Sequence, residues 1–300
     1  MPYLFLTLSV LAGVTKGFCG KSISKYTSEF KSAAFSNLIR MLFCILIGFI
    51  FVLFDGGIDD LVPSVEFILV SILSGATTAG FVIFWLFAVR RGAYVLVDVF
   101  LTLGSLLSAC LSIIFYGAEF SFAQGIGFAI LIIAAIVMCS YSAQIKTKIT
   151  LSTILLLILV GCANGVSDFA KEIFNREIGN AYSASAFNFY TFVFSAFALF
   201  FVYTFSKKTE QSTLNVTYIK KKGMPLIALM STCLFLNSFF KTIASRKLDM
   251  TVIAPLSQGA ALILVAIMSA IFFGEKIKPR CVVGIILAIS ALLIMNLVHV

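Results

Sequence analysis

The amino-acid sequence predicts an all-α integral membrane protein of about ten transmembrane helices, arranged as two inverted five-helix repeats. Of its 300 residues, 61% are hydrophobic and 12% are charged, and the mean hydropathy is +1.09. Soluble domains are closer to half apolar and a quarter charged, so there is too little polar side chain here for a water-facing surface. A spanning helix needs about 20 apolar residues, which gives roughly ten spans in a chain of this length.

Ten apolar stretches separated by short polar clusters give the expected spans. Helices are the expected form because lipid leaves backbone groups no other hydrogen-bond partner. We expect the longest loop, Lys207–Lys222, between the seventh and eighth spans. The predicted helices cover residues 3–20, 32–54, 65–89, 93–116, 121–142, 151–174, 181–206, 223–245, 249–273 and 280–298.

An internal repeat becomes visible when the chain is compared with itself at a shift of 157 residues. Ile114–Met138 then lies against Ile271–Met295, with seven identities that include the pairs Gly117/Gly274 and Gly127/Gly284. Five helices per copy is an odd number, so the copies at 1–146 and 147–300 must have opposite orientations. Inverted repeats are typical of alternating-access carriers.

Two pairs of glycines four residues apart mark the first helix of each copy. The pairs are Gly13/Gly17 and Gly161/Gly165. This spacing of small residues allows the backbones of two membrane helices to approach closely. We therefore expect tight helix packing at both pairs.

The net charge of +9 does not indicate nucleic-acid binding, because the basic residues gather at helix ends near lipid headgroups. Fifteen of the 22 lysines and arginines fall in alternate loops, beginning with the loop after the first span. This bias predicts that those loops face the cytoplasm and that both termini lie outside. We expect a multi-pass protein of the cell (plasma) membrane, in contact with lipid and without a nucleic-acid partner. Its oligomeric state is open.

Cofactor and metal chemistry find no support in the sequence. The seven cysteines include no C-x-x-C spacing, and the only histidine is His299. Histidine-based metal sites and catalytic triads are therefore not expected. No ATP-binding or nucleophile motif is present. We expect no enzyme activity, no cofactor and no metal.

Ionisable and amide side chains lie within several predicted spans, where they are costly and usually face a cavity or a partner. They predict a polar, water-filled site for a charged or zwitterionic solute. The expected substrate-binding residues are Lys16, Arg40, Asp98, Asn164, Asp168, Asn188, Asn237, Lys241 and Gln258.

These residues could bind either of two kinds of substrate group. The basic ones would bind a carboxylate or phosphate, whereas Asp98 or Asp168 would bind an amine or carry a coupling proton. Asp98 could instead pair with a neighbouring arginine. Lys171 and Glu172, near a helix end, are interpreted as a pair that extends toward the membrane surface. Trp85 is interpreted as part of an interfacial aromatic belt.

The stretch from Pro255 to Met295 resembles the end of an EamA-type domain of the drug/metabolite transporter superfamily. The resemblance rests on Pro255 early in one helix, Gly274–Glu275 at its end, and Gly284 early in the next helix. The first half departs from this pattern, because Asp98 stands opposite Pro255. The resemblance implies a ten-helix carrier of small metabolites with a central cavity lined by the first to fourth and sixth to ninth helices. It also implies that both termini lie inside, against the charge bias.

Pro255 is expected to act as a hinge or kink, since proline removes a helix hydrogen bond. Together these features predict a secondary active transporter for a small polar metabolite such as an amino acid, with proton coupling or exchange both possible. The alternative is a flippase or exporter for a lipid-linked or amphipathic compound.

Overall fold

The computed structural model describes residues 2–24, 26–27, 29–91, 94–119, 121–142, 151–273 and 279–296. In these residues the chain is helical throughout its regular structure. The long helices are α1 (Pro2–Ser24), α2 (Phe30–Asp55), α3 (Val65–Arg91), α4 (Tyr94–Tyr116), α5 (Phe122–Ser142), α6 (Leu151–Ile173), α7 (Ala184–Phe205), α9 (Met224–Ala244), α10 (Met250–Phe273) and α11 (Pro279–Asn296).

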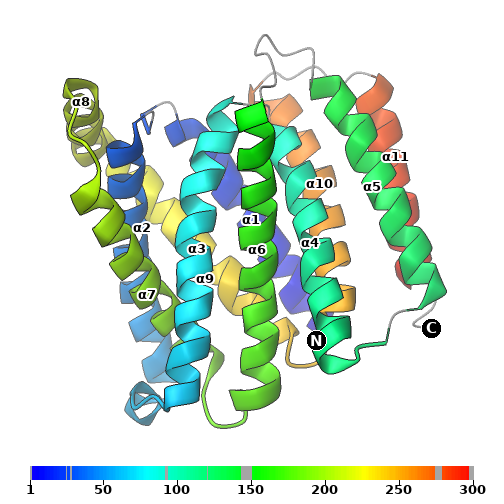
Figure 1. Ribbon diagram of the computed structural model, residues 1–300, viewed down its shortest axis with the longest axis horizontal. Coiled ribbons are helices and arrows are strands. Elements are labelled where there is room, and N and C mark those ends of the chain that lie inside the picture. Colours follow the sequence, from blue (N-terminus) through cyan, green and yellow to red (C-terminus); the bar gives the residue numbers. More distant parts are fainter. Residues whose placement is uncertain are drawn as a thin grey trace.

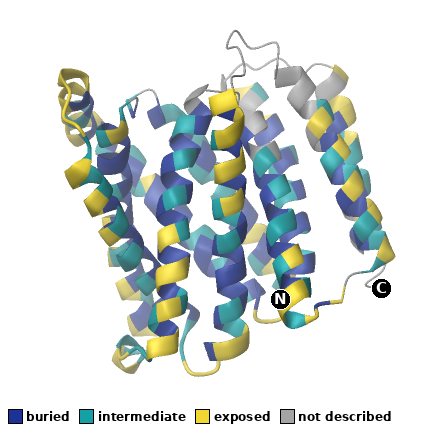
Figure 2. Cartoon of the chain, viewed as in Figure 1, coloured by how far each residue is buried: buried dark blue, intermediate teal, exposed yellow. Residues whose placement is uncertain are grey.

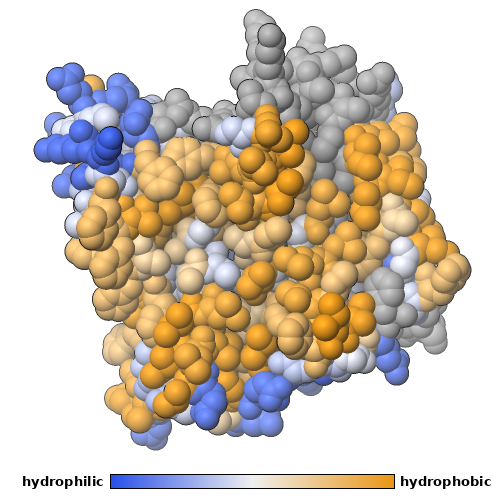
Figure 3. Space-filling view, in the orientation of Figure 1, coloured by the Kyte–Doolittle hydropathy of each residue, from blue (hydrophilic) through white to orange (hydrophobic). Residues whose placement is uncertain are grey.

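These ten helices confirm the predicted spans, with ends that move by three residues or fewer in most cases. Seven segments are long and apolar enough to cross a membrane, and the described parts of α4, α5 and α11 are shorter apolar helices. Figure 3 shows the resulting apolar belt, with hydrophilic residues at the α8 corner and along the opposite edge. Large apolar side chains such as Phe54, Phe205 and Leu151 are exposed on the outside, where lipid would cover them. The protein is therefore an integral, multi-pass membrane protein.

The predicted loop at Lys207–Lys222 is wrong, because most of it is helical. The short helix α8 (Glu210–Tyr218) continues through one π-helical turn, η3 (Ile219–Gly223), into α9. The Thr209 side chain caps α8 by accepting a hydrogen bond from the Ser212 backbone N–H at 3.1 Å. The Ser212 hydroxyl donates in turn to the Thr209 carbonyl oxygen at 2.7 Å. This capping satisfies N–H groups that have no partner inside the helix. Hydropathy misses such a helix because its residues are polar.

Special backbone positions shape the ends of two helices. Gly117 follows α4 with a φ of +60°, and Gly57 follows α2 with a φ of +79°. Only glycine adopts this left-handed conformation readily. The Gly117 N–H then donates to Ile113 O at 3.0 Å, which closes the last turn of α4.

The ten long helices form two facing layers of five (Figure 1). One layer holds α7, α3, α6, α4 and α5, and the other holds α2, α9, α1, α10 and α11. Across and within the layers, eight helices pack in a closed ring in the order α1, α9, α2, α7, α3, α6, α4 and α10, while α5 and α11 pack on each other beside it. Buried residues concentrate on the inner sides of the ring (Figure 2).

Both ends of the chain reach the same edge of the bundle: α1 begins and α11 ends at the edge opposite α8 (Figure 1). An even number of spans requires this. Among the described residues, Lys21, Lys31 and the lysines between Lys207 and Lys222 accordingly lie at the α8 end. We call the opposite edge the terminal end.

Glycines close the seam between α4 and α6. A Cβ atom on Gly161 would lie 2.6 Å from the Phe100 carbonyl oxygen, and one on Gly104 would lie 2.6 Å from Gly161 Cα. Gly165 also meets the Gly104 backbone. The close approach expected at Gly161/Gly165 is confirmed.

The corresponding seam between α1 and α10 is packed much less extensively. A Cβ on Gly13 would meet only the Asn237 side chain, at 2.9 Å. Gly13 and Gly17 instead face a cavity. The prediction of close backbone packing is therefore wrong at Gly13, because this glycine borders the cavity rather than the backbone of a neighbouring helix.

Candidate functional site

A polar cavity of about 90 Å³ lies inside the ring of helices. Seven of the ring helices line it, all except α2. This agrees with the central cavity implied by the family resemblance apart from that one helix. The lining side chains that carry polar groups are Ser9, Lys16, Thr78, Trp85, Asn164, Ser167, Asp168, Lys171, Asn237, Ser238, Lys241, Ser257 and Gln258.

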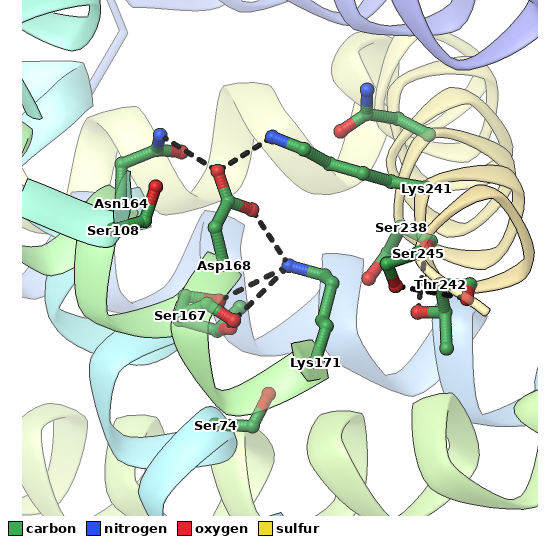
Figure 4. A network of polar contacts seen from close by, with 12 residues as sticks. Ser74, Ser108, Asn164, Ser167, Asp168, Lys171, Ser238, Lys241, Thr242 and Ser245 are labelled. Carbon is green, nitrogen blue, oxygen red and sulfur yellow. Dashed lines mark hydrogen bonds and ion pairs between the residues drawn. The ribbon is translucent and has the colours of Figure 1, made fainter. Parts of the chain in front are cut away.

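Asp168 is the centre of the site, because its carboxylate binds two lysines (Figure 4). Oδ1 accepts a hydrogen bond from Lys171 Nζ at 3.0 Å, and Oδ2 accepts one from Lys241 Nζ at 2.5 Å. Asn164 Nδ2 also donates to Oδ2, at 3.4 Å. The side chains of Asp168, Lys171 and Lys241 are only 4%, 7% and 7% exposed. Two ammonium groups thus share one carboxylate inside the membrane.

The two ion pairs differ in what they connect. Asp168 and Lys171 lie three residues apart on α6, so their contact is local. Lys241 reaches Asp168 from α9, which belongs to the other layer. The Asp168–Lys241 pair therefore crosses the cavity and joins the two layers.

Further polar groups surround this centre. Lys171 also donates to the Ser167 carbonyl oxygen at 3.3 Å, and the Ser167 hydroxyl lies 3.1 Å from the Thr78 hydroxyl. On the α1 side, Asn237 donates to the Ser9 carbonyl and hydroxyl oxygens, at 2.8 and 3.0 Å. These contacts hold the cavity wall in a defined arrangement with amide and hydroxyl groups facing inward.

Lys16 adds a third ammonium group to the wall. It lies in the middle of α1, and its Nζ is 5.4 Å from the centre of the Phe81 ring. Its position between the two glycines Gly13 and Gly17 keeps the surrounding wall open. Lys16 therefore lines the same cavity as Lys171 and Lys241.

The structure brings six of the nine predicted binding residues together around the cavity. They are Lys16, Asn164, Asp168, Asn237, Lys241 and Gln258. The side chain of Asp98 lies outside the described residues, as do Gly274 and Glu275. Pro255 lies inside α10, three residues before Gln258, and the helix continues past it to Phe273.

Two predicted binding residues lie behind the cavity wall. Arg40 is fully buried on α2, where its Nη1 donates to Asn37 Oδ1 at 3.1 Å. Asn188 donates to the Ala184 carbonyl at 2.7 Å and to the Thr242 hydroxyl at 3.2 Å. Asn188 thus supports the turn of α9 that carries Lys241, rather than lining the cavity.

Lys171 and Glu172 do not form the outward-reaching pair that was expected. Lys171 points into the cavity, while Glu172 accepts a hydrogen bond from the Ser112 hydroxyl of α4 at 2.7 Å. Consecutive helix residues project about 100° apart, so these neighbours serve different sides of α6. The spacing from Asp168 to Lys171 was the available signal for a shared site.

Trp85 is also not part of an interfacial belt. Its side chain is buried at 4% exposure and lines the cavity. The ring lies against Gly20 of α1, where a Cβ would overlap it and would meet Met230 Cε at 2.9 Å. Trp85, Gly20 and Met230 therefore pack α3, α1 and α9 together on the α8 side of the cavity.

A second polar cluster joins the helices at the terminal end, which we call the polar closure. Arg176 connects its members: Nε donates to Glu172 Oε1 at 3.1 Å, and Nη2 donates to Asp249 Oδ1 at 2.7 Å. Its guanidinium also lies 4.7 Å from the centre of the Tyr116 ring. Beside it, Asn175 donates to the Thr242 carbonyl at 2.9 Å and to the Ser245 hydroxyl at 2.6 Å.

The polar closure begins where α6 changes into a π-helical turn, η2 (Phe174–Ile178). Such turns are frequent at functional sites. Here the turn carries Asn175 and Arg176, so it presents polar side chains to α9, α4 and the start of α10. The closure therefore joins these helices at the terminal end through hydrogen bonds, whereas Trp85, Gly20 and Met230 pack together on the α8 side.

A multi-pass helical bundle around a buried polar cavity is typical of one class of protein, the membrane transporters. A solved crystal structure shares this fold, with a TM-score of 0.65 and 14% sequence identity over 97% of this chain and 96% of that chain. No curated protein matches the sequence.

The model of the EamA-like transporter family matches residues 151–297. Through this half, the chain belongs to the EamA-like transporter family, within the drug/metabolite transporter superfamily. The resemblance noted at Pro255–Met295 is thereby confirmed, and the protein is a membrane transporter.

Proposed function

We propose that this protein is a secondary carrier that moves a small, charged or zwitterionic organic metabolite across the membrane by alternating access. The observation that carries the proposal is the buried group formed by Asp168, Lys171 and Lys241. Burying charged groups inside the membrane is costly, and such groups usually mark a substrate or ion pathway. Their amide and hydroxyl neighbours suit an organic solute.

The arrangement of the helices supports alternating access. Exchanging residues 1–146 with 147–300 maps α2 onto α7, α4 onto α10 and α5 onto α11, and each of these pairs is in contact. The same exchange maps the α3–α6 contact onto the α9–α1 contact. Two inverted repeats of this kind would let one side of the bundle open as the other closes.

The two ends of the cavity support the same mechanism. The polar closure connects helices at the terminal end, and Trp85 packs against Gly20 on the α8 side; either contact could open in turn. Pro255 lies one turn before Gln258 and leaves the early part of α10 without one backbone hydrogen bond. It is a natural hinge for the helix that borders the looser α1–α10 seam.

Counterflow in proteoliposomes tests the proposal. Proteoliposomes that contain the purified protein are preloaded with an unlabelled amino acid, sugar or organic acid. They should then take up the same compound in labelled form from outside. Lys16→Met and Lys241→Met should abolish this uptake while the protein remains folded. Lys247→Met is the matched control, because Lys247 is exposed at the terminal end and should retain full uptake.

Two results would contradict the carrier. Full uptake by both cavity variants would refute the assignment of Lys16 and Lys241 to the substrate-binding site. Fluorescent lipid that crosses the bilayer, with no exchange of any water-soluble compound, would instead identify a flippase.

A further inference from the structure

The charges around the cavity indicate what kind of substrate the carrier takes, an inference that rests on the proposed function. Lys171 and Lys241 share the single carboxylate of Asp168, and all three side chains are at least nine-tenths buried. These three side chains therefore carry two positive charges and one negative charge. An excess of positive charge in the membrane interior is unfavourable unless a counter-ion accompanies it.

An amine would have to share Asp168 with three donors that already bind its carboxylate. Oδ1 is bound by Lys171, and Oδ2 is bound by both Lys241 and Asn164. A cationic substrate would compete with these donors and would add to the excess positive charge. An anion would reduce the excess charge and would bind the lysine ammonium groups directly.

We propose that the substrate is a small organic anion whose carboxylate or phosphate group takes the place of Asp168 on Lys241. In the empty cavity, Asp168 acts as an internal counter-ion that holds both lysines. When the anion binds, Lys171 keeps its contact with Asp168, because both residues lie on α6. Lys241 changes partner, and the connection between α6 and α9 across the cavity is released.

This exchange of partners couples binding to movement. The Asp168–Lys241 pair is the ionic contact that joins the two layers through the described cavity. The cavity of about 90 Å³ is smaller than the roughly 300–1,000 Å³ of typical ligand sites. It accommodates an anionic head group, and release of the cross-cavity pair lets the layers separate to admit the rest of the substrate.

Thermal unfolding of the purified protein tests the proposal through Asp168→Asn, which keeps the size of the side chain and removes its charge. The probes are succinate, inorganic phosphate, putrescine and glucose, at equal ionic strength. We expect Asp168→Asn to be less stable than wild type without an anion and to regain stability with succinate or phosphate. Without the internal competitor, half-maximal stabilisation should occur at an anion concentration about tenfold lower than for wild type. The succinate and phosphate arms show which anionic group the site prefers.

Glu177→Gln is the matched control, because it removes an exposed carboxylate that does not line the cavity. It should behave as wild type with every probe. Lys171→Met provides a second variant, since it leaves Asp168 and Lys241 as a balanced pair. We expect it to fold as wild type and to lose the stabilisation by anions.

The inference is refuted if putrescine rather than an anion restores Asp168→Asn, if no anion stabilises either protein, or if Lys171→Met keeps the response. Exchange of a sugar or an amine in proteoliposomes, without exchange of anions, would leave the carrier intact and refute the anionic substrate. Absence of exchange for every compound would refute the carrier, and the anion-dependent stability of Asp168→Asn would still decide whether the cavity binds anions.

Discussion

Replacement of Gly104 by alanine should destabilise the protein, because the added methyl group has no room in the α4–α6 seam. Its Cβ would lie 2.6 Å from Gly161 Cα, whereas ordinary contacts begin at 3.4 Å. The obstacle is backbone, which cannot rotate away as a side chain can. The two helices would have to move apart by more than 0.8 Å, the difference between these two distances, because the Gly161 carbonyl oxygen lies closer still to the added Cβ.

The size of the effect follows from opposing contributions. A gap of 0.5–1 Å removes about a quarter to a half of each dispersion contact, and overpacking typically costs about 1–3 kcal/mol. Alanine recovers about 1 kcal/mol through its higher helix propensity. We therefore expect the free energy of unfolding to fall by about 2 kcal/mol, taking the upper end of the overpacking range.

Denaturation in detergent, followed by circular dichroism, measures this change. Gly80→Ala is the matched control, since a Cβ there would lie 3.5 Å from Phe84 Cε2, an ordinary contact. It should be neutral or stabilising. Gly161→Ala should be as harmful as Gly104→Ala, and the double variant should cost less than the sum because both obstruct one seam. If Gly104→Ala proves as stable as Gly80→Ala, the seam is not the tight contact inferred here.

Two further predictions concern the ends of the bundle. Arg176→Gln should lower the free energy of unfolding by about 1–2 kcal/mol, mostly because buried Glu172 loses a partner while the exposed pair with Asp249 contributes little. It should also speed labelling of Ser238→Cys by a membrane-impermeant maleimide, in a background where Cys110, Cys139, Cys162 and Cys281 are serine. Unchanged labelling would show that the polar closure does not limit access. At the α8 end, Tyr218→Ala should cost about 0.5–1.5 kcal/mol through loss of stacking on Tyr26, whose ring centre is 3.8 Å away. Tyr218→Phe keeps the stacking and removes only the hydroxyl contact with Tyr26, so it should lose much less stability; equal loss in both variants would refute the stacking.

Hydropathy alone predicted the spans because lipid imposes the same requirement on each one. It could not predict α8, whose residues are polar and whose start depends on capping by Thr209. The site was partly predictable for a similar reason. Lys16, Asp168 and Lys241 were identified because a charge in mid-span needs a cavity or a partner.

The direction in which each polar side chain points was not available from the sequence. Lys171 faces the cavity and Glu172 faces α4, although the two are adjacent on one helix. Arg40 lies deep in its span yet does not line the cavity, because it is buried beside Asn37 on α2, the ring helix that contributes no lining residue. Such differences depend on which neighbours each helix packs against, and the chain does not encode that locally.

The glycine contact between α4 and α6 has a mechanical consequence. Because backbone lies directly against backbone there, rearranging side chains cannot separate the two helices. We therefore expect α4 and α6 to stay in contact when the layers move. Across the ring, the α1–α10 seam has Ala261 at the position that matches Gly104, and Gly13 faces only the end of a flexible side chain. Motion of the two layers would therefore be asymmetric. The layers would rotate about the α4–α6 contact, and the larger displacement would occur at the α1–α10 seam, next to Lys16.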